Sequence, residues 1–211
     1  STNGVFPKAW KRTEKGFSLL KDGGIEVVEK ELLSSKICQC FDVKQVIYNR
    51  SVFAEEPVTI SENITSKDFS IVSMEAFEVY SQNHDRNIRK YILALDKHDY
   101  YMMNIIDYLV GNTDRHWGNW GVLVNNVNNK PVSLHPLMDF NKTFNSYETI
   151  EGSNCQTCFG KRINQKDAAL EAVRKIGLNQ IKEVNYDWFE YFPEYVGMFK
   201  KRYGILKRIN D

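Results

Sequence analysis

The sequence predicts an α+β fold of two lobes: a small β-rich lobe over residues 1–63 and a larger, mostly helical lobe over residues 64–211. Short strand-like segments and turns dominate the first part, an apolar helical pattern covers residues 98–112, and helical, aromatic-rich sequence follows from about residue 165. The 211 residues, 42% of them hydrophobic and 26% charged, suffice for one domain or one two-lobed unit with a substantial core.

Composition and charge narrow the classes of function. The net charge of +1 predicts neither a nucleic-acid-binding surface nor a membrane surface. No run of about 18 apolar residues is present, so no transmembrane helix is predicted. Four cysteines without a secretory signal are typical of a reducing compartment, so we expect a cytoplasmic protein. The chain begins with Ser1 rather than Met, which leaves open whether residues precede it.

The elements of the first lobe are expected in the order strand, helix, strands. Residues 16–21 resemble a strand that ends in a glycine-rich turn over residues 22–24. Residues 25–40 have helical periodicity, with acidic residues near the start of the helix. Residues 45–48 and 57–60 are predicted to be short strands.

The second lobe begins with a predicted helix near residues 70–83. The best-defined buried helix covers residues 98–112, and Gly111 is its expected C-cap. A polar loop follows, and then strands over residues 121–124 and 132–137 flank a polar turn. These two strands and their turn predict a β-hairpin directly after the loop.

Three polar side chains around this hairpin indicate phosphoryl transfer. Asp114 and Asn119 stand five positions apart in the loop, as do the base Asp and the Mg²⁺-binding Asn of protein-kinase catalytic loops. Asp139 ends the second strand and precedes Phe140, much as in the Asp-Phe-Gly segment of kinases. Because a hairpin returns the chain, Asn119 and Asp139 can lie side by side and offer oxygen ligands of the kind that Mg²⁺ prefers.

Each of these motifs has a purely structural alternative. An Asp followed five positions later by Asn is common, and Asp114 could instead form an Asx-turn. The order of the residues favours a kinase-like fold: Lys21 on a strand, an acid-bearing helix, a strand pair, and then Asp114, Asn119 and Asp139.

The segments Gly111–Asn119 and Pro136–Asn141 resemble the HipA-like serine/threonine kinase family, whose loop runs Asn-x-Asp-x-His-x-x-Asn. The Asp-Arg-His string is also similar to the catalytic loops of phosphatidylinositol kinases, distant members of the same superfold. The resemblance implies a two-lobed protein-kinase-like fold, ATP and Mg²⁺ as cofactors, and a protein Ser/Thr hydroxyl as acceptor. No Gly-x-Gly-x-x-Gly is present, so a loop with few glycines would have to cover the phosphates.

The resemblance also implies roles for single residues. Asp114 would be the catalytic base, and Asn119 and Asp139 would hold the metal. Lys21 would bind the α- and β-phosphates, with Glu31 as its partner and Glu29 as the fallback. The other implied ATP contacts are Gly4 and Lys8 in the covering loop, where Ser1 and Thr2 are candidate autophosphorylation sites, and Ser61, Glu62 and Asn63 in the hinge.

Other residues near the loop carry weaker expectations. Arg115 and His116 are expected to support the loop, although Arg115 could equally be solvated. Cys155 and Cys158 have the spacing of a redox pair or of half a zinc site. Zinc would need two further ligands, which the Cys38 and Cys40 pair could supply only by approaching in space.

Several functions share these residues. A lipid or small-molecule kinase would use the same catalytic groups, and a nucleotide-binding pseudokinase would bind ATP without turnover. A non-enzymatic interaction domain is the third alternative. The partners expected are a nucleotide and a protein acceptor, an antitoxin-like partner stays open, and nucleic-acid binding is not expected of this chain alone.

Overall fold

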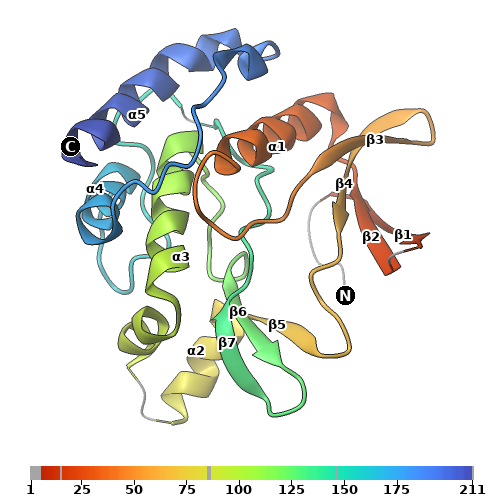
Figure 1. The fold of residues 1–211 in the computed structure, drawn as a ribbon, viewed down its shortest axis with the longest axis vertical. Helices are drawn as coiled ribbons and strands as arrows, with labels where there is room; N and C mark the ends of the chain where they lie inside the picture. The colour runs from red at the N-terminus through yellow and green to blue at the C-terminus, as the bar shows by residue number, and fades with distance from the viewer. Residues whose placement is uncertain (1–5, 15, 85–86, 146, 211) are drawn as a thin grey trace.

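The structure is a computed structural model that describes residues 6–14, 16–84, 87–145 and 147–210. A small antiparallel sheet is followed by a second small sheet and a mostly helical part, which confirms the α+β class predicted from the sequence (Figure 1). The lobe boundary predicted near residue 64 falls in the connection between β4 and β5 and stays a prediction.

The first sheet is antiparallel, with strand order β1-β2-β4-β3. Its elements are β1 (Lys8–Thr13), β2 (Gly16–Lys21), α1 (Gly24–Cys38), β3 (Asn49–Phe53) and β4 (Glu56–Glu62). Helix α1 lies beside β4, and its inward residues, among them Val28 and Leu32, are buried. The predicted strand ending in Lys21 and the predicted helix after it are therefore confirmed.

The predicted strand at residues 45–48 is wrong. Only Gln45 forms an isolated bridge, with Leu137, and the strand of this region is β3, a few residues later. The segment is extended because its polar groups bind other parts of the chain: the Val46 N–H donates to the Leu137 carbonyl at 2.8 Å, and the Tyr48 N–H donates to Ser35 Oγ at 3.2 Å.

A second antiparallel sheet follows, with strand order β5-β6-β7. Its strands are β5 (Phe69–Ser73), β6 (Gly121–Asn125) and β7 (Lys130–Leu134), so the predicted hairpin is confirmed, although its second strand ends at Leu134. Gly121 permits the close approach of β6 to β5, because a Cβ atom there would lie 2.1 Å from the Val72 carbonyl oxygen.

The helix predicted near residues 70–83 is partly wrong. Its first residues belong to β5, and α2 begins at Met74 and ends at Gln82. The reason is local: residues 69–73 pair with β6, and the Ser73 side chain then caps the helix by accepting from the Ala76 N–H at 3.3 Å.

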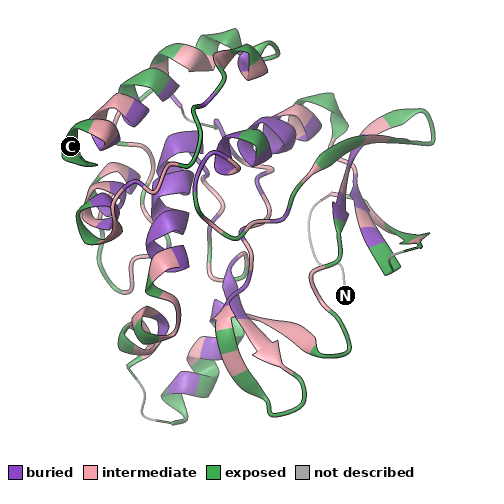
Figure 2. Cartoon of the chain, in the orientation of Figure 1, coloured by how far each residue is buried: buried purple, intermediate pink, exposed green. Residues whose placement is uncertain are grey.

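Helix α3 (Ile88–Val110) carries the loop that contains Asp114. A kink at Asp96 divides it, and the part after the kink matches the buried helix predicted at 98–112 (Figures 1 and 2). Asp96 Oδ1 accepts from the Asp99 N–H at 3.2 Å and so caps this second part. Gly111 ends the helix in the left-handed conformation, with φ of 60°, which confirms the expected C-cap.

The last elements are α4 (Gln165–Ile176), the 3₁₀ turns η1 (Tyr186–Phe189) and η2 (Pro193–Tyr195), and α5 (Val196–Asn210). Helices α4 and α5 pack against α3, whereas η1 lies beside α1 and η2 beside α5. The core around α3 is rich in aromatic residues, including Tyr108, Phe144 and Phe199, all at most 2% exposed. Among the residues that the structure describes, no helix is long and apolar enough to span a bilayer.

Candidate active site

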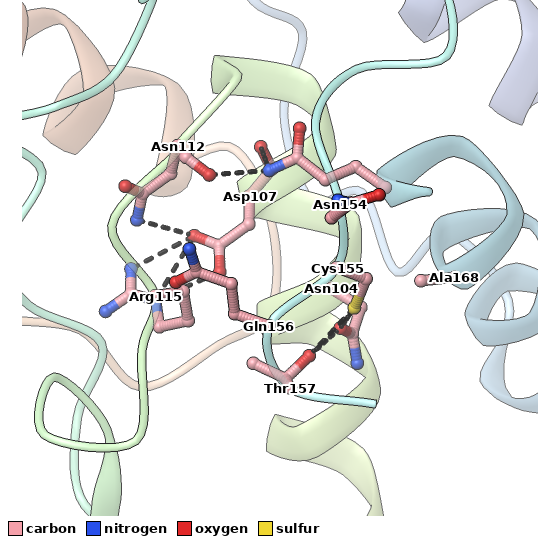
Figure 3. Close-up of a pocket in the computed structure, with 10 residues that line it drawn as sticks. Asn104, Asp107, Asn112, Arg115, Asn154, Cys155, Gln156, Thr157 and Ala168 are labelled. Atoms are coloured by element: carbon pink, nitrogen blue, oxygen red, sulfur yellow. Dashed lines mark hydrogen bonds and ion pairs between the residues drawn. The ribbon is translucent and has the colours of Figure 1, made fainter. Parts of the chain in front are cut away.

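Arg115 holds together the loop that follows α3. Its guanidinium is buried and forms an ion pair with Asp107, with Nε 2.9 Å from Oδ2 and Nη2 3.0 Å from Oδ1 (Figure 3). The Nη1 atom donates to the Asn119 carbonyl at 3.1 Å and to the Met138 carbonyl at 2.6 Å. The solvated alternative for Arg115 is therefore wrong, because the side chain links α3 to both ends of the β6–β7 hairpin.

Asp114 presents its carboxylate to two other polar groups. Its Oδ1 atom lies 3.0 Å from Lys142 Nζ, and its Oδ2 atom accepts from Asn119 Nδ2 at 3.4 Å. The Asp114 N–H donates to Asn112 Oδ1 at 3.1 Å, so the Asx-turn in this loop is made by Asn112 and not by Asp114. The Asp114 carboxylate thus takes no part in that turn.

Asn119 and His116 shape the rest of the loop. Asn119 Nδ2 also donates to the Asp114 carbonyl at 2.8 Å, so the amide nitrogen is used within the loop and Oδ1 is the atom left for a cation. His116 is exposed, and its Nδ1 atom accepts from the Gly118 N–H at 3.0 Å. Its contact is therefore a local one that stabilises the turn.

Asp139 lies opposite Lys21, which comes from the first sheet. Its backbone has a φ of 64°, a conformation that non-glycine residues rarely adopt, and its N–H donates to the Tyr48 hydroxyl at 3.1 Å. Its Oδ1 atom accepts from Lys21 Nζ at 2.6 Å. Burial acts to raise the pKa of Asp139, but the positive charges around it, above all the Lys21 ammonium, together outweigh burial, so the net pKa falls below its ordinary value.

Lys21 is shared between two carboxylates. Its Nζ atom lies 2.8 Å from Glu31 Oε1 on α1 as well as 2.6 Å from Asp139. Burial acts to lower the pKa of Lys21, but the two carboxylates raise it overall, so the side chain stays an ammonium. The Thr59 hydroxyl donates to Glu31 Oε2 at 2.7 Å and orients this acid. Glu29 pairs with Arg50 instead.

Of the other residues expected to contact the nucleotide, Lys8 is tied most directly to Lys21 and Asp139. Lys8 lies in β1, opposite Lys21, and its charge also lowers the pKa of Asp139. Ser61 and Glu62 end β4, and the Asn63 N–H donates to the Phe17 carbonyl at 3.1 Å. The first sheet thus uses the Asn63 N–H, and the hinge expected at Ser61, Glu62 and Asn63 stays a prediction. Gly4, Ser1 and Thr2 lie outside the described residues.

Sequence reasoning missed the residues that support this group. Asp107 was the easiest of them to predict, because a buried acid in a mostly apolar stretch of helix requires a partner. Asn112 completes the same cluster by donating from Nδ2 to Asp107 Oδ1 at 3.0 Å. Lys142 and Tyr48 gave no such signal in the sequence. Lys142 contacts Asp114, and Tyr48 contacts Asp139, only because the fold brings together segments that are distant in the sequence.

The donor set at Asn119 and Asp139 is chemically suited to a hard divalent cation. One carboxylate and one amide oxygen resemble the protein share of a Mg²⁺ site, because Mg²⁺ retains waters and substrate phosphates as its other ligands. The described residues contain no group of three or more His, Cys, Asp or Glu that could hold a metal, which speaks against the zinc alternative for the cysteines. Cys40 instead contacts the carbonyls of Lys36 and Glu183.

The fold and this arrangement define the chain as a protein with a protein-kinase-like architecture. A strand lysine paired with a helix glutamate faces an Asp-Phe segment, and a catalytic-type loop lies next to it. No protein-family model matches the chain, and none of the curated proteins does.

Solved structures specify the fold more closely. The chain is similar to the Helicobacter pylori proinflammatory kinase CtkA, with a TM-score of 0.75 and 15% sequence identity over 100% of this chain and 91% of that chain. It is also similar to HipA of the Shewanella oneidensis MR-1 toxin–antitoxin system, solved with HipB and operator DNA, with a TM-score of 0.54 and 12% identity over 100% of this chain and 67% of that chain. The chain therefore has a HipA-like kinase fold, as its motifs indicated.

Proposed function

We propose that this protein is an ATP- and Mg²⁺-dependent phosphotransferase, with a protein Ser/Thr hydroxyl as acceptor. The observation that carries the proposal is the double contact of Arg115 Nη1, which binds the Asn119 carbonyl at 3.1 Å and the Met138 carbonyl at 2.6 Å. One guanidinium thus joins the backbone of the loop that bears Asp114 and Asn119 to the backbone of the residue before Asp139.

Asp114 is the proposed base. Its carboxylate is partly exposed and has no role in the local turn, so it can accept the proton of an incoming hydroxyl. Lys142, 3.0 Å from Asp114 Oδ1, places a positive charge where the transferring phosphoryl group would carry negative charge. The same pair keeps the carboxylate oriented while it takes the proton.

Lys21 is the proposed phosphate-binding cation. Glu31 and Asp139 hold its ammonium on two sides, and the Thr59 hydroxyl fixes Glu31. Asn119 and Asp139 would hold Mg²⁺, which when bound neutralises charge on the phosphates. Lys8 and the residues Ser61 and Glu62 at the end of β4 complete the proposed nucleotide contacts.

The two similar solved structures suggest two further parts of the proposal, a protein partner and a cellular location. CtkA is named a kinase, and HipA was solved with a protein partner and DNA. We therefore include an antitoxin-like protein partner and a cytoplasmic location, both of which co-purification and fractionation would test. The near-neutral charge gives no support to DNA binding by this chain alone.

Replacement of the proposed base tests the function. Asp114→Asn keeps the shape of the side chain but removes its basicity, so we expect transfer from labelled ATP to fall by about 10²- to 10⁴-fold. Nucleotide affinity should stay within about twofold, since the proposed ATP contacts lie on other residues. The matched control is Asp68→Asn, which changes an exposed acid in a distant turn and should leave transfer unchanged.

The acceptors in this assay separate the alternatives. Transfer to lipid or small molecules but not to protein would replace the proposed acceptor class. Nucleotide binding without any transfer by the unmodified protein would identify a pseudokinase. Full transfer by the Asp114→Asn variant would remove the role of Asp114.

A further inference from the structure

Cys155 and Cys158 are in contact next to the proposed active site. Their Sγ atoms lie 2.9 Å apart, and both side chains are partly exposed. A disulfide would need these atoms to approach by about 0.9 Å more. The other two cysteines differ, because Cys38 and Cys40 are completely buried. Cys155 and Cys158 can therefore be reached from solvent, whereas Cys38 and Cys40 cannot.

The turn between these two cysteines is fastened to the catalytic-type loop. Gln156 Nε2 donates to the Thr113 carbonyl at 3.2 Å, and the Gln156 carbonyl accepts from Trp117 Nε1 at 3.0 Å. Phe159, directly after Cys158, packs edge-on against Trp117, with ring centroids 5.6 Å apart. Thr113 precedes Asp114 and Trp117 stands two before Asn119, so a shift of this turn is passed to both.

The other side of the pair contacts α3. Cys155 Sγ lies 3.4 Å from Asn104 Oδ1, and the Thr157 hydroxyl also donates to Asn104 Oδ1 (Figure 3). These groups share a small polar cavity with Asp107 and Arg115, the ion pair that holds the loop. Closure of a disulfide would draw Cys155 away from Asn104 at the wall of this cavity.

We propose that Cys155 and Cys158 are a redox-active dithiol that forms a reversible disulfide by exchange with a low-molecular-weight disulfide, and that closure displaces the loop of Asp114 and Asn119. The Cys155 thiolate attacks the small disulfide, a mixed disulfide forms, and one small thiolate leaves. Cys158 then loses its proton and attacks Cys155 Sγ, which releases the second small thiolate. Both protein thiols are oxidised, and the small disulfide is reduced to two thiols.

The two sulfurs are suited to different steps. The hydrogen bond from Cys158 is the largest influence on Cys155 and, with that from the Thr157 backbone N–H, outweighs burial, so the pKa of Cys155 is lowered to about 7. The same contact and burial raise the pKa of Cys158. Cys155 is thus the attacking thiolate near neutral pH, and Cys158 is the resolving thiol.

Peptide mapping after incubation with glutathione disulfide tests the site. Cys155 and Cys158 fall in one tryptic peptide, residues 143–161, which should lose two hydrogens, resist alkylation and recover with dithiothreitol. Cys158→Ser should trap glutathione on Cys155, and Cys155→Ser should form neither product. Full alkylation of both thiols in the treated, unmodified protein would overturn the proposal without recourse to any variant.

Loop displacement has its own readout. Oxidation should shift the fluorescence emission of Trp117, and the same shift should be absent from the Trp117→Phe variant. Identical emission spectra of the reduced and oxidised protein would contradict the coupling between the disulfide and the loop. The further expectation that oxidation lowers phosphoryl transfer by about tenfold rests on the proposed function. Disulfide formation with an emission shift in a protein that never transfers phosphate would support the redox site and refute only the kinase proposal.

Discussion

At the scale of single residues, Lys142 is the most informative side chain of the proposed active site. It follows Asp139 by three positions and pairs with Asp114 across 28 residues of sequence, although 43% of its side chain is exposed. An exposed ion pair stabilises a fold by less than about 1 kcal/mol, so stability gives little reason for this contact. A cation beside the proposed base is better explained by charge that develops during phosphoryl transfer.

Lys142→Met should therefore separate catalysis from folding. We expect phosphoryl transfer to fall about a hundredfold, because one positive charge on the transferring group is lost. The free energy of unfolding, measured by urea titration, should change by less than about 1 kcal/mol. Lys142→Arg keeps the charge and should recover part of the activity. Equal rates for the Met variant and the unmodified protein would exclude Lys142 from the transfer step.

At the scale of elements, the end of α3 decides where the loop starts. Gly111 adopts φ of 60°, and a Cβ atom there would lie 2.5 Å from the Tyr147 ring. The chain therefore leaves α3 toward Asn112 and Asp114 only because residue 111 has no side chain.

Gly111→Ala should destabilise the protein by at least about 1–2 kcal/mol, from the left-handed backbone alone. Gly204→Ala is the matched control, since Gly204 lies inside α5 with open space at its Cβ position and should stabilise by about 0.5–1 kcal/mol. Thermal or urea unfolding would compare the two. A Gly111→Ala protein as stable as the parent would disprove the requirement for glycine.

Elements with strong local signals were predictable, and those decided by tertiary pairing were not. The buried part of α3 and the β6–β7 hairpin carry their own periodicity and turn residues. Residues 69–73 instead form a strand because β6 lies beside them, and residues 45–48 are extended without a strand because their polar groups bind Leu137 and Ser35. Such pairing outweighs the local preference of a short segment.

At the scale of the whole molecule, the candidate site joins residues that are far apart in sequence, because Lys21 of the first sheet contacts Asp139, which follows the last strand of the second. The order of Lys21, Asp114 and Asp139 could be read from the sequence, because motif spacing encodes their chemistry. The bridging role of Arg115 could not, since its partners Asn119 and Met138 become neighbours only when the hairpin closes. Sequence thus indicated the proposed reacting groups, while only the fold shows how Arg115 links the segments that carry them.

Binding across both sheets should stabilise the entire protein. With Mg²⁺ and ATP at about 100 times the dissociation constant, we expect a gain of about 2.7 kcal/mol, or a rise in Tm of about 5–10 °C. A chelator should remove most of this rise, and Asp139→Asn should reduce its metal-dependent part, while Asp68→Asn should show the full rise. The same rise with and without metal would contradict the roles of Asn119 and Asp139.

The double contact of Arg115 also has a practical consequence. Because this guanidinium fixes the spacing between the two ends of the hairpin, the exposed tip over residues 125–130 is not what sets that spacing. Val127 at the tip is 84% exposed. An epitope or a fluorescent label grafted there should leave the contacts of Arg115 at the hairpin's base unchanged.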